Sequence, residues 1–296
     1  MARQRDRRDH GVPVPVGYRR TAAGRVGAVL RWFALGVAAL AFLLPFYLLL
    51  RNGLAGEDEL SSRDWTFLPR TLHWSNFGEV LSGGQVPLLR SLLHSTAVAV
   101  LQTAGQVLLC SLAGYGLARI PYRHATKVLY AVLASLMVPT AVTFVPSFVV
   151  VSSLGWISDL RGLVVPGLFS ALNVFLFRQY FLDFPAELEE AGRLDGLNRW
   201  GVFRRVVVPN CTGFFAAIAV IDFIGSWNQF LWPLIIAQDD SSWTVQVALS
   251  TLLSAQNPKI NLLFAAAAVS ILPIVLVFAV LQRYLVRGVA ETGLRG

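Results

Sequence analysis

Six long apolar stretches constrain the fold of this 296-residue chain more strongly than any other feature of its sequence. A helix needs about 20 predominantly apolar residues to cross the roughly 30 Å hydrocarbon core of a bilayer. We expect the spans near residues 26–50, Ser91–Ala118, Val128–Val151, Leu163–Leu182, Thr212–Ile236 and Ile260–Tyr284. Because a helix satisfies its own backbone hydrogen bonds in lipid, the pattern predicts an all-α membrane protein with six transmembrane helices.

The composition supports a membrane protein and argues against a nucleic-acid-binding one. Hydrophobic residues make up 55% of the chain and charged residues only 14%, and the mean hydropathy is +0.59. The net charge of +8 comes mostly from arginines that flank the apolar stretches instead of forming one basic face. We therefore expect no nucleic-acid partner. Cys110 and Cys211 lie in or beside the stretches without metal-ligand spacing, so we expect them to be buried.

The positions of lysine and arginine predict which ends of the spans face the cytoplasm. Eighteen of these residues lie at the two termini or around the second–third and fourth–fifth connections, six lie in the opposite segments, and Arg31 is set aside. Positive charge is retained on the cytoplasmic side, so both termini are expected there and the acidic segment 51–87 outside. We predict a basic disordered cytoplasmic tail at 1–25, a six-span domain at 26–284 and a cytoplasmic C-terminal tail at 285–296.

A charged island, Phe184–Pro209, separates the fourth and fifth spans. Pro185 suits the first turn of a helix, where its missing N–H has no cost. Apolar residues then recur on one face, at Leu188, Ala191 and Leu194, which predicts a short amphipathic helix. Gly196 can adopt the left-handed conformation that ends such a helix. Asn198 is a good N-cap for a second helix, with an apolar side formed by Trp200, Phe203 and Val207.

The same island carries a spaced motif. It contains Glu190, Ala191 and Gly192, then Asp195, Gly196 and Leu197, and eight residues later Val206, Val208 and Pro209. This run resembles the E-A-A, two residues, D-G-A, eight residues, I-x-L-P loop of permease subunits from binding-protein-dependent ABC importers, with small or apolar replacements. The resemblance implies a coupling helix that docks on a cytoplasmic ATPase subunit through Glu190, Ala191, Gly192, Asp195 and Gly196. The alternative is an ordinary amphipathic cytoplasmic loop.

Other stretches resemble the carbohydrate-type members of that family. They are Phe177–Phe181, Ser226–Leu234, which is similar to an S-W-N-x-F-x-W-P-L run, and the ending Gln282–Gly288. The likeness to maltose-permease-type subunits implies an ABC type I importer permease fold in the cell membrane. It also implies a di- or oligosaccharide cargo, an extracytoplasmic sugar-binding protein, a second permease subunit in a heterodimer and two ATPase subunits. Alternatives are a glycerol phosphate or polyol permease and, in a different class, an ion-driven secondary transporter.

Polar residues of the fifth span are the candidates for a translocation path. Asp222 is an acid at bilayer depth, where a charge is costly unless it faces the bundle or a watery cavity. Trp227, Asn228 and Gln229 offer the aromatic face and amide groups that a sugar needs. Asp222 could instead be bonded within the bundle or to a partner subunit. Trp227 and Trp232 could belong to an interfacial aromatic belt, and Asn228 could bond a neighbouring helix.

No catalytic or metal-binding set is expected. The four histidines, His10, His73, His94 and His124, lack metal-ligand spacing. The sequence has no G-x-x-x-x-G-K-[ST] loop for nucleotide phosphates. We therefore expect a transport subunit that is not an enzyme and has no cofactor of its own, with ATP bound by a partner.

Overall fold

The computed structural model describes residues 22–83 and 86–293. Within these ranges every regular element is a helix, which confirms the prediction of an all-α protein. The chain divides into two compact units, Met1–Leu48 and Leu49–Gly296.

Helix α1 (Ala22–Gly53) makes up the described part of the first unit and runs into the second. It begins inside the predicted tail at 1–25, so residues 22–25 are helical, and the rest of that tail lies outside the described residues. The large apolar side chains from Val29 to Leu44 are exposed. A helix that is apolar on every side is suited to a lipid surrounding.

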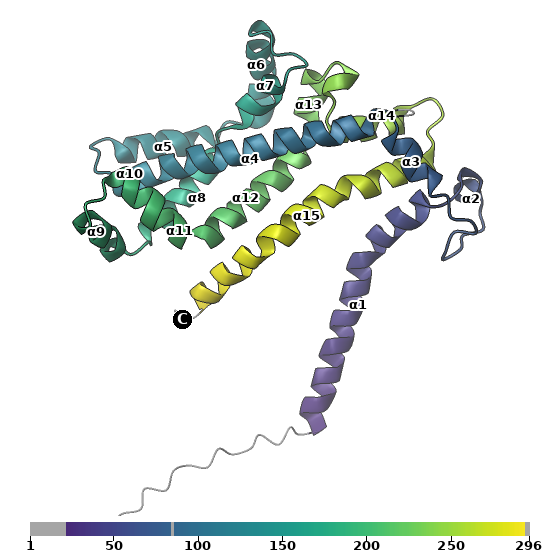
Figure 1. Ribbon diagram of the computed structural model, residues 1–296, viewed down its shortest axis with the longest axis horizontal. Helices are drawn as coiled ribbons and strands as arrows, with labels where there is room; N and C mark the ends of the chain where they lie inside the picture. Colours follow the sequence, from purple (N-terminus) through teal and green to yellow (C-terminus); the bar gives the residue numbers. More distant parts are fainter. Residues whose placement is uncertain (1–21, 84–85, 294–296) are drawn as a thin grey trace, which may run out of the picture. The chain divides into compact units, whose positions relative to one another are not determined.

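Four helices form the centre of the second unit: α4 (Leu88–Arg119), α8 (Ala171–Leu182), α12 (Thr212–Trp227) and α15 (Ile260–Gly293). Helix α4 packs against α8 and α12, and α12 packs against α15 (Figure 1). Gly114 permits the contact between α4 and α8, because a Cβ atom there would lie 2.6 Å from Phe177 Cβ. Small residues of this kind let helix backbones approach closely within a membrane bundle.

The number of possible membrane spans matches the prediction. Three described helices are long and apolar enough to cross a bilayer: Val29–Gly53, Leu88–Arg119 and Ile260–Tyr284. Three bent pairs meet the same criterion together, which brings the total to six if each pair is one span. The pairs are Ala125–Ser135 with Thr140–Ser153, bent by 95°, Leu160–Gly167 with Ala171–Leu182, bent by 44°, and Arg199–Asn210 with Thr212–Trp227, bent by 81°.

The predicted span Val128–Val151 is wrong as one continuous helix. It consists of α5 (Ala125–Ser135) and α6 (Thr140–Ser153), with a sharp break between them. Pro139 precedes α6 with extended backbone angles, φ −61° and ψ 134°. A proline lacks the N–H needed to continue α5 and disfavours the helical conformation in the residue before it. The break therefore follows from local sequence chemistry.

Two further span boundaries differ from the prediction. The span predicted at Leu163–Leu182 begins with α7 (Leu160–Val164) and a 3₁₀ turn, η1 (Val165–Gly167), and bends before α8. The span predicted at Thr212–Ile236 ends at Trp227, and α13 (Leu231–Ile236) is a separate short helix. The missing N–H of Pro233 is tolerated because this residue lies in the first turn of α13.

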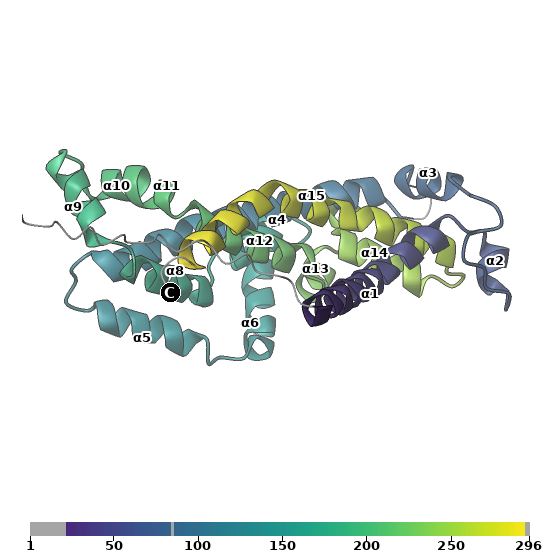
Figure 2. The ribbon, with the colours of Figure 1, turned by 90° about the horizontal axis from the view of Figure 1, so that it is seen from below.

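Two groups of short helices lie at opposite ends of the second unit (Figures 1 and 2). One end carries α9 (Ala186–Leu194), α10 (Arg199–Val202), the π-helical turn η2 (Phe203–Val207) and α11 (Val208–Asn210). The other end carries α2 (Glu57–Ser61), α3 (Ser75–Leu81) and, after the turn η3 (Asp240–Ser242), α14 (Val245–Ser254). The island and residues 51–83 are thus at opposite ends of the second unit, as the predicted topology requires.

A buried ion pair organises the segment after α1. The guanidinium of Arg51 contacts the Glu59 carboxylate, which also accepts hydrogen bonds from the Thr66 hydroxyl at 3.0 Å and the Arg70 backbone N–H at 3.1 Å. Burial acts to raise the pKa of Glu59, but these hydrogen bonds and the neighbouring positive charges outweigh it and lower that pKa below its ordinary value. The ionised carboxylate therefore stabilises this segment.

Candidate functional site: an exposed helix at one end and a polar groove in the bundle

The helix–turn–helix predicted in the island is present. Helix α9 starts at Ala186, directly after Pro185. The proline therefore occupies the N-cap position and not the first helical turn in which it was predicted. Gly196 has φ +83°, which confirms the left-handed turn, and the Leu197 N–H donates to the Gly192 carbonyl at 3.0 Å. The Asn198 side chain accepts from the Gly201 N–H at 2.7 Å, which confirms the predicted N-cap of α10.

Helix α9 turns its apolar face away from the bundle. Leu188 is 43% exposed and Leu194 is 90% exposed, and Ala191 and Glu190 between them are also exposed. Gly192 lies on the opposite face, where an added Cβ would be 3.1 Å from Val206 Cγ2. The apolar face predicted from sequence therefore forms a free surface at this end of the unit, while Gly192 allows close packing inside the helix pair.

The buried face of α9 contains a charged residue that the sequence did not single out. Glu189 is 3% exposed, and its Oε1 lies 3.1 Å from Arg119 Nε at the end of α4. Its Oε2 accepts from the Tyr115 hydroxyl at 3.3 Å and lies 3.4 Å from the guanidinium of Arg193. In the sequence, Glu189 is an acid in a first helical turn, which the helix dipole alone explains. Only the fold shows that it is buried.

Helix α10 and the turn η2 pack on the bundle through aromatic contacts. Phe203 and Val207 are buried, as the predicted apolar side requires, whereas Trp200 is 54% exposed and stacks on Phe203. Phe203 in turn lies 5.0 Å from the ring of Tyr115. The helix pair is therefore anchored to α4 both by rings and by the Glu189 carboxylate.

Asp222 is half-buried in the bundle and has a partner there. The Asn173 side-chain amide of α8 donates to both carboxylate oxygens of Asp222 at 2.9 Å. The same amide lies 3.1 Å from the Gln106 side-chain oxygen on α4. The network Asp222–Asn173–Gln106 thus joins three central helices, the arrangement that the bundle-bonding interpretation of Asp222 requires.

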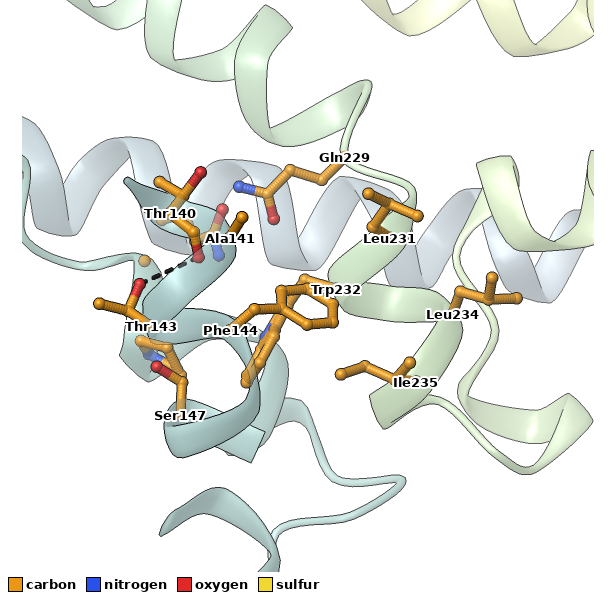
Figure 3. A pocket seen from close by; sticks show the side chains of 13 residues that line it. Thr140, Ala141, Thr143, Phe144, Ser147, Gln229, Leu231, Trp232, Leu234 and Ile235 are labelled. Atoms are coloured by element: carbon orange, nitrogen blue, oxygen red, sulfur yellow. Dashed lines mark hydrogen bonds between the residues drawn. The ribbon is translucent and has the colours of Figure 1, made fainter. Parts of the chain in front are cut away.

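A groove of about 640 Å³ lies beside α4. Polar side chains from α6, α4 and the α12–α13 connection line it, together with aromatic and aliphatic ones; the polar members are Thr140, Thr143, Ser147, Gln102 and Gln229. Figure 3 shows the α6 hydroxyls and the Gln229 amide around Phe144 and Trp232. The two rings meet edge to face at 5.8 Å, and the Trp232 indole N–H donates to the Gly162 carbonyl at 3.0 Å.

The predicted translocation residues are distributed over different environments. Gln229 lines the groove. Trp227 is 2% exposed and stacks on Phe223, so it belongs to the packed core in this conformation and not to an interfacial belt. Asn228 is exposed and accepts from the Gln246 amide at 3.4 Å.

Sequence reasoning missed the groove residues of α6. Thr140, Thr143 and Ser147 recur at helical spacing, which places their hydroxyls along one face. This spacing after Pro139 was the available signal, but it was hidden inside a stretch assigned to a single apolar span. For Trp232 the sequence offers an interfacial belt as its role, whereas the structure places it in the wall of the groove.

Apolar helices, a polar groove beside α4 and an exposed amphipathic helix at one end are features that a membrane transport permease requires. Residues 111–291 match the family described as binding-protein-dependent transport system inner membrane component. The chain belongs to this family, which makes it a transport subunit of the inner membrane and not a catalytic enzyme.

Curated relatives cover most of the chain. It is 31% identical over 268 residues to the lactose transport system permease protein LacG of Rhizobium radiobacter, covering 90% of this chain and 97% of the relative. It is 29% identical over 260 residues to the arabinooligosaccharides transport system permease protein AraQ of Bacillus subtilis (strain 168), covering 87% and 92%. It is 29% identical over 262 residues to the sn-glycerol-3-phosphate transport system permease protein UgpE of Yersinia pestis bv. Antiqua (strain Antiqua), covering 86% and 93%.

A solved structure has the same fold. It is a chain from the crystal structure of a bacterial ABC transporter involved in the import of the acidic polysaccharide alginate. The TM-score is 0.76 at 21% identity, and the match covers 89% of this chain and 98% of that one. The predicted ABC importer permease fold is therefore confirmed.

Proposed function

We propose that this chain is the membrane-spanning subunit of an ATP-driven importer that translocates a di- or oligosaccharide delivered by an extracytoplasmic binding protein. The observation that carries the proposal is the exposed apolar face of α9, at the end of the unit opposite residues 51–83. An amphipathic helix of this kind, held by a capped turn, is suited to fit a groove on a separate protein. ATP binding by that protein would drive the spans between inward- and outward-facing arrangements.

The groove supports a sugar as the cargo. Hydroxyl and amide groups can bond sugar hydroxyls, and the Phe144 and Trp232 rings offer the apolar surface that a pyranose face needs. Two of the relatives are named for lactose and arabinooligosaccharides, and a third for glycerol phosphate. No Lys or Arg occurs among the described residues that line the groove. A phosphate would favour such cations, so the groove supports a neutral sugar over glycerol phosphate.

The docking site for the ATPase subunit would use the exposed residues of the coupling loop. The proposed docking residues are Glu190, Ala191, Gly192, Asp195 and Gly196. Glu190 would offer its carboxylate to a basic partner residue, and Ala191 would allow close approach. Gly192 faces Val206 inside the helix pair, so its contribution would be to the shape of the pair. Gly196 would fix the turn that presents the docking surface of α9.

The remaining partners follow from the same proposal. The importer would contain a second permease subunit in a heterodimer and two ATPase subunits, which would bind the ATP. Both termini and the coupling loop would face the cytoplasm, as the distribution of Lys and Arg indicates. This subunit would then need no metal or cofactor of its own.

Reconstitution tests the proposal against an ion-driven carrier. The chain is purified through an affinity tag from its native membrane, and its co-purifying subunits are identified. Proteoliposomes are then made with the chain alone and with the whole complex plus binding protein. We expect sugar uptake only from the complex with internal ATP. Uptake by the chain alone under an ion gradient would overturn the proposal.

A further inference from the structure

The Glu189 cluster, which consists of Glu189, Tyr115, Arg119 and Arg193, is a buried charged contact at the base of α9. The Glu189 side chain is 4% exposed and that of Arg119 is 17% exposed. Arg119 approaches Oε1, while Tyr115 and Arg193 approach Oε2. One carboxylate therefore meets a neutral donor and two guanidinium groups.

The cluster joins segments that are far apart in the sequence. Tyr115 and Arg119 lie on the last turns of α4, and Glu189 lies on α9. Arg119 also donates to the Phe184 backbone carbonyl, in the turn that enters α9. The start of α9 and the end of α4 are thus held together at two points by one arginine.

Apart from the ring contacts that η2 makes with Tyr115, the large apolar side chains of α9 itself do not attach it to α4. Its large apolar side chains, Leu188 and Leu194, face outward, and Gly192 packs on the α10 side of the helix pair. A buried carboxylate is costly unless its partners are well placed. A hydrophobic contact would hold α9 in place equally well. The Glu189 carboxylate, which lies in ion-pair contact with Arg119 and accepts a hydrogen bond from the Tyr115 hydroxyl, also fixes the orientation of α9.

We infer that Glu189 is a positioning residue that makes α9 and α4 move as one body. This inference rests on the proposed function, in which α9 receives the displacement from the ATPase subunit. It goes further by naming the joint through which that displacement reaches the transmembrane bundle.

The far part of α4 leads directly to the groove. Gln102 lies on the same uninterrupted helix as Arg119, about 26 Å away at 1.5 Å per residue. Its amide donates to the Leu163 carbonyl at 2.8 Å, and its oxygen accepts from the Ser226 hydroxyl. Gln102 also lines the groove. Movement of the α4 end would therefore be transmitted to α7, α12 and the groove wall.

The test compares two glutamates of one helix in the complete importer. Glu189→Gln removes the charge of the joint with almost no change of shape. Glu187→Gln is the matched control, because Glu187 is exposed on the same helix. Each variant complex is reconstituted, and the sugar transported per ATP hydrolysed is measured. In separate samples, Ala191→Cys provides a cross-linking reporter of contact with the ATPase subunit.

We expect Glu189→Gln to lower the transport-to-hydrolysis ratio at least tenfold while the Ala191→Cys cross-link forms as in the native background. Glu187→Gln should keep the native ratio. A merely structural loss would lower transport and hydrolysis together and leave the ratio unchanged. A ratio within twofold of native in an assembled Glu189→Gln complex would overturn the inference.

Two further measurements keep the outcomes separate. If Glu189→Gln fails to assemble, Tyr115→Phe removes a single hydroxyl of the cluster, and an unchanged ratio there would also overturn the inference. Arg119→Lys keeps the positive charge but not both guanidinium contacts, so we expect an intermediate ratio. Absence of any cross-link from Ala191→Cys in the native background would instead reject the docking proposal itself.

Discussion

The close contact of α4 with α8 gives a prediction of defined size. Gly114 lies where α4 crosses α8, and a Cβ atom there would be 2.6 Å from Phe177 Cβ and 2.9 Å from the Arg178 backbone nitrogen. Non-bonded heavy atoms are most stable at roughly 3.5–4.0 Å. The substitution Gly114→Ala would therefore force the two helices apart by roughly 1 Å, because backbone atoms cannot rotate out of the way.

The expected cost is that of overpacking a close-packed interior. Extra methyl groups in such positions typically cost about 1–3 kcal/mol. A value of about 2 kcal/mol lowers the ratio of folded to unfolded protein about 30-fold. Alanine also raises the intrinsic helix propensity by up to about 1 kcal/mol, so the observed loss needs a reference glycine in the same helix.

Gly116 is that reference. It lies two residues further along α4, and an added Cβ there would meet no heavy atom within 4 Å. We expect Gly116→Ala to be neutral or slightly stabilising, and Gly114→Ala to be about 2 kcal/mol less stable than Gly116→Ala. The assay is reversible unfolding of the purified chain in mixed detergent micelles, followed by tryptophan fluorescence. Equal stability of the two variants would refute the close approach of α4 and α8.

Three more predictions concern the coupling loop, the half-buried Asp222 and the pH dependence of Glu59. Glu190→Ala and Gly196→Val should leave the chain in the membrane but uncouple sugar uptake from ATP hydrolysis. Glu190→Ala removes a docking carboxylate, and Gly196→Val places a branched residue at φ +83°. Full uptake by both variants would contradict this prediction. If the Asp222 charge serves the translocation path, Asp222→Asn should lower sugar uptake without loss of assembly of the complex. Unchanged uptake would mean that Asp222 has only the structural role of its hydrogen bond with Asn173. The pKa of Glu59 is lowered from its ordinary value of 4.5. The stabilisation by the ionised carboxylate is therefore full above that value and is lost as the pH falls through the lower folded-state pKa. Proteolysis of segment 54–74 should therefore accelerate on acidification, and Glu59→Gln should remove that dependence.

Much of the fold could be predicted because membrane spans are encoded in local composition. The stretch Ile260–Tyr284 is strongly apolar and forms one helix long enough to cross a bilayer, as predicted. Turn chemistry was equally local: Gly196 and Asn198 occupy the backbone and capping roles that their side chains favour. The break before Pro139 was missed because proline is tolerated in many membrane helices, so its presence alone does not distinguish a kink from an interruption.

The candidate site was harder to predict because it depends on which helix faces meet. Glu189 and Glu190 are identical in type and adjacent in sequence, yet one is buried against Arg119 and the other is exposed. Nothing in the local pattern separates them. Likewise, Trp227 and Trp232 lie in one short motif, but the first is packed in the core and the second lines the groove. These assignments need the tertiary packing.

The most direct test of the account is the side of the membrane on which the coupling loop lies. Arg199→Cys, at the start of α10, is exposed, and the native Cys110 and Cys211 are buried, so a membrane-impermeant maleimide reports mainly on position 199. Arg63→Cys serves as the control for the opposite side. We expect Arg199→Cys to react only in inside-out vesicles and to be protected by the ATPase subunit, and Arg63→Cys to react in intact cells. Labelling of Arg199→Cys from outside intact cells would contradict the account.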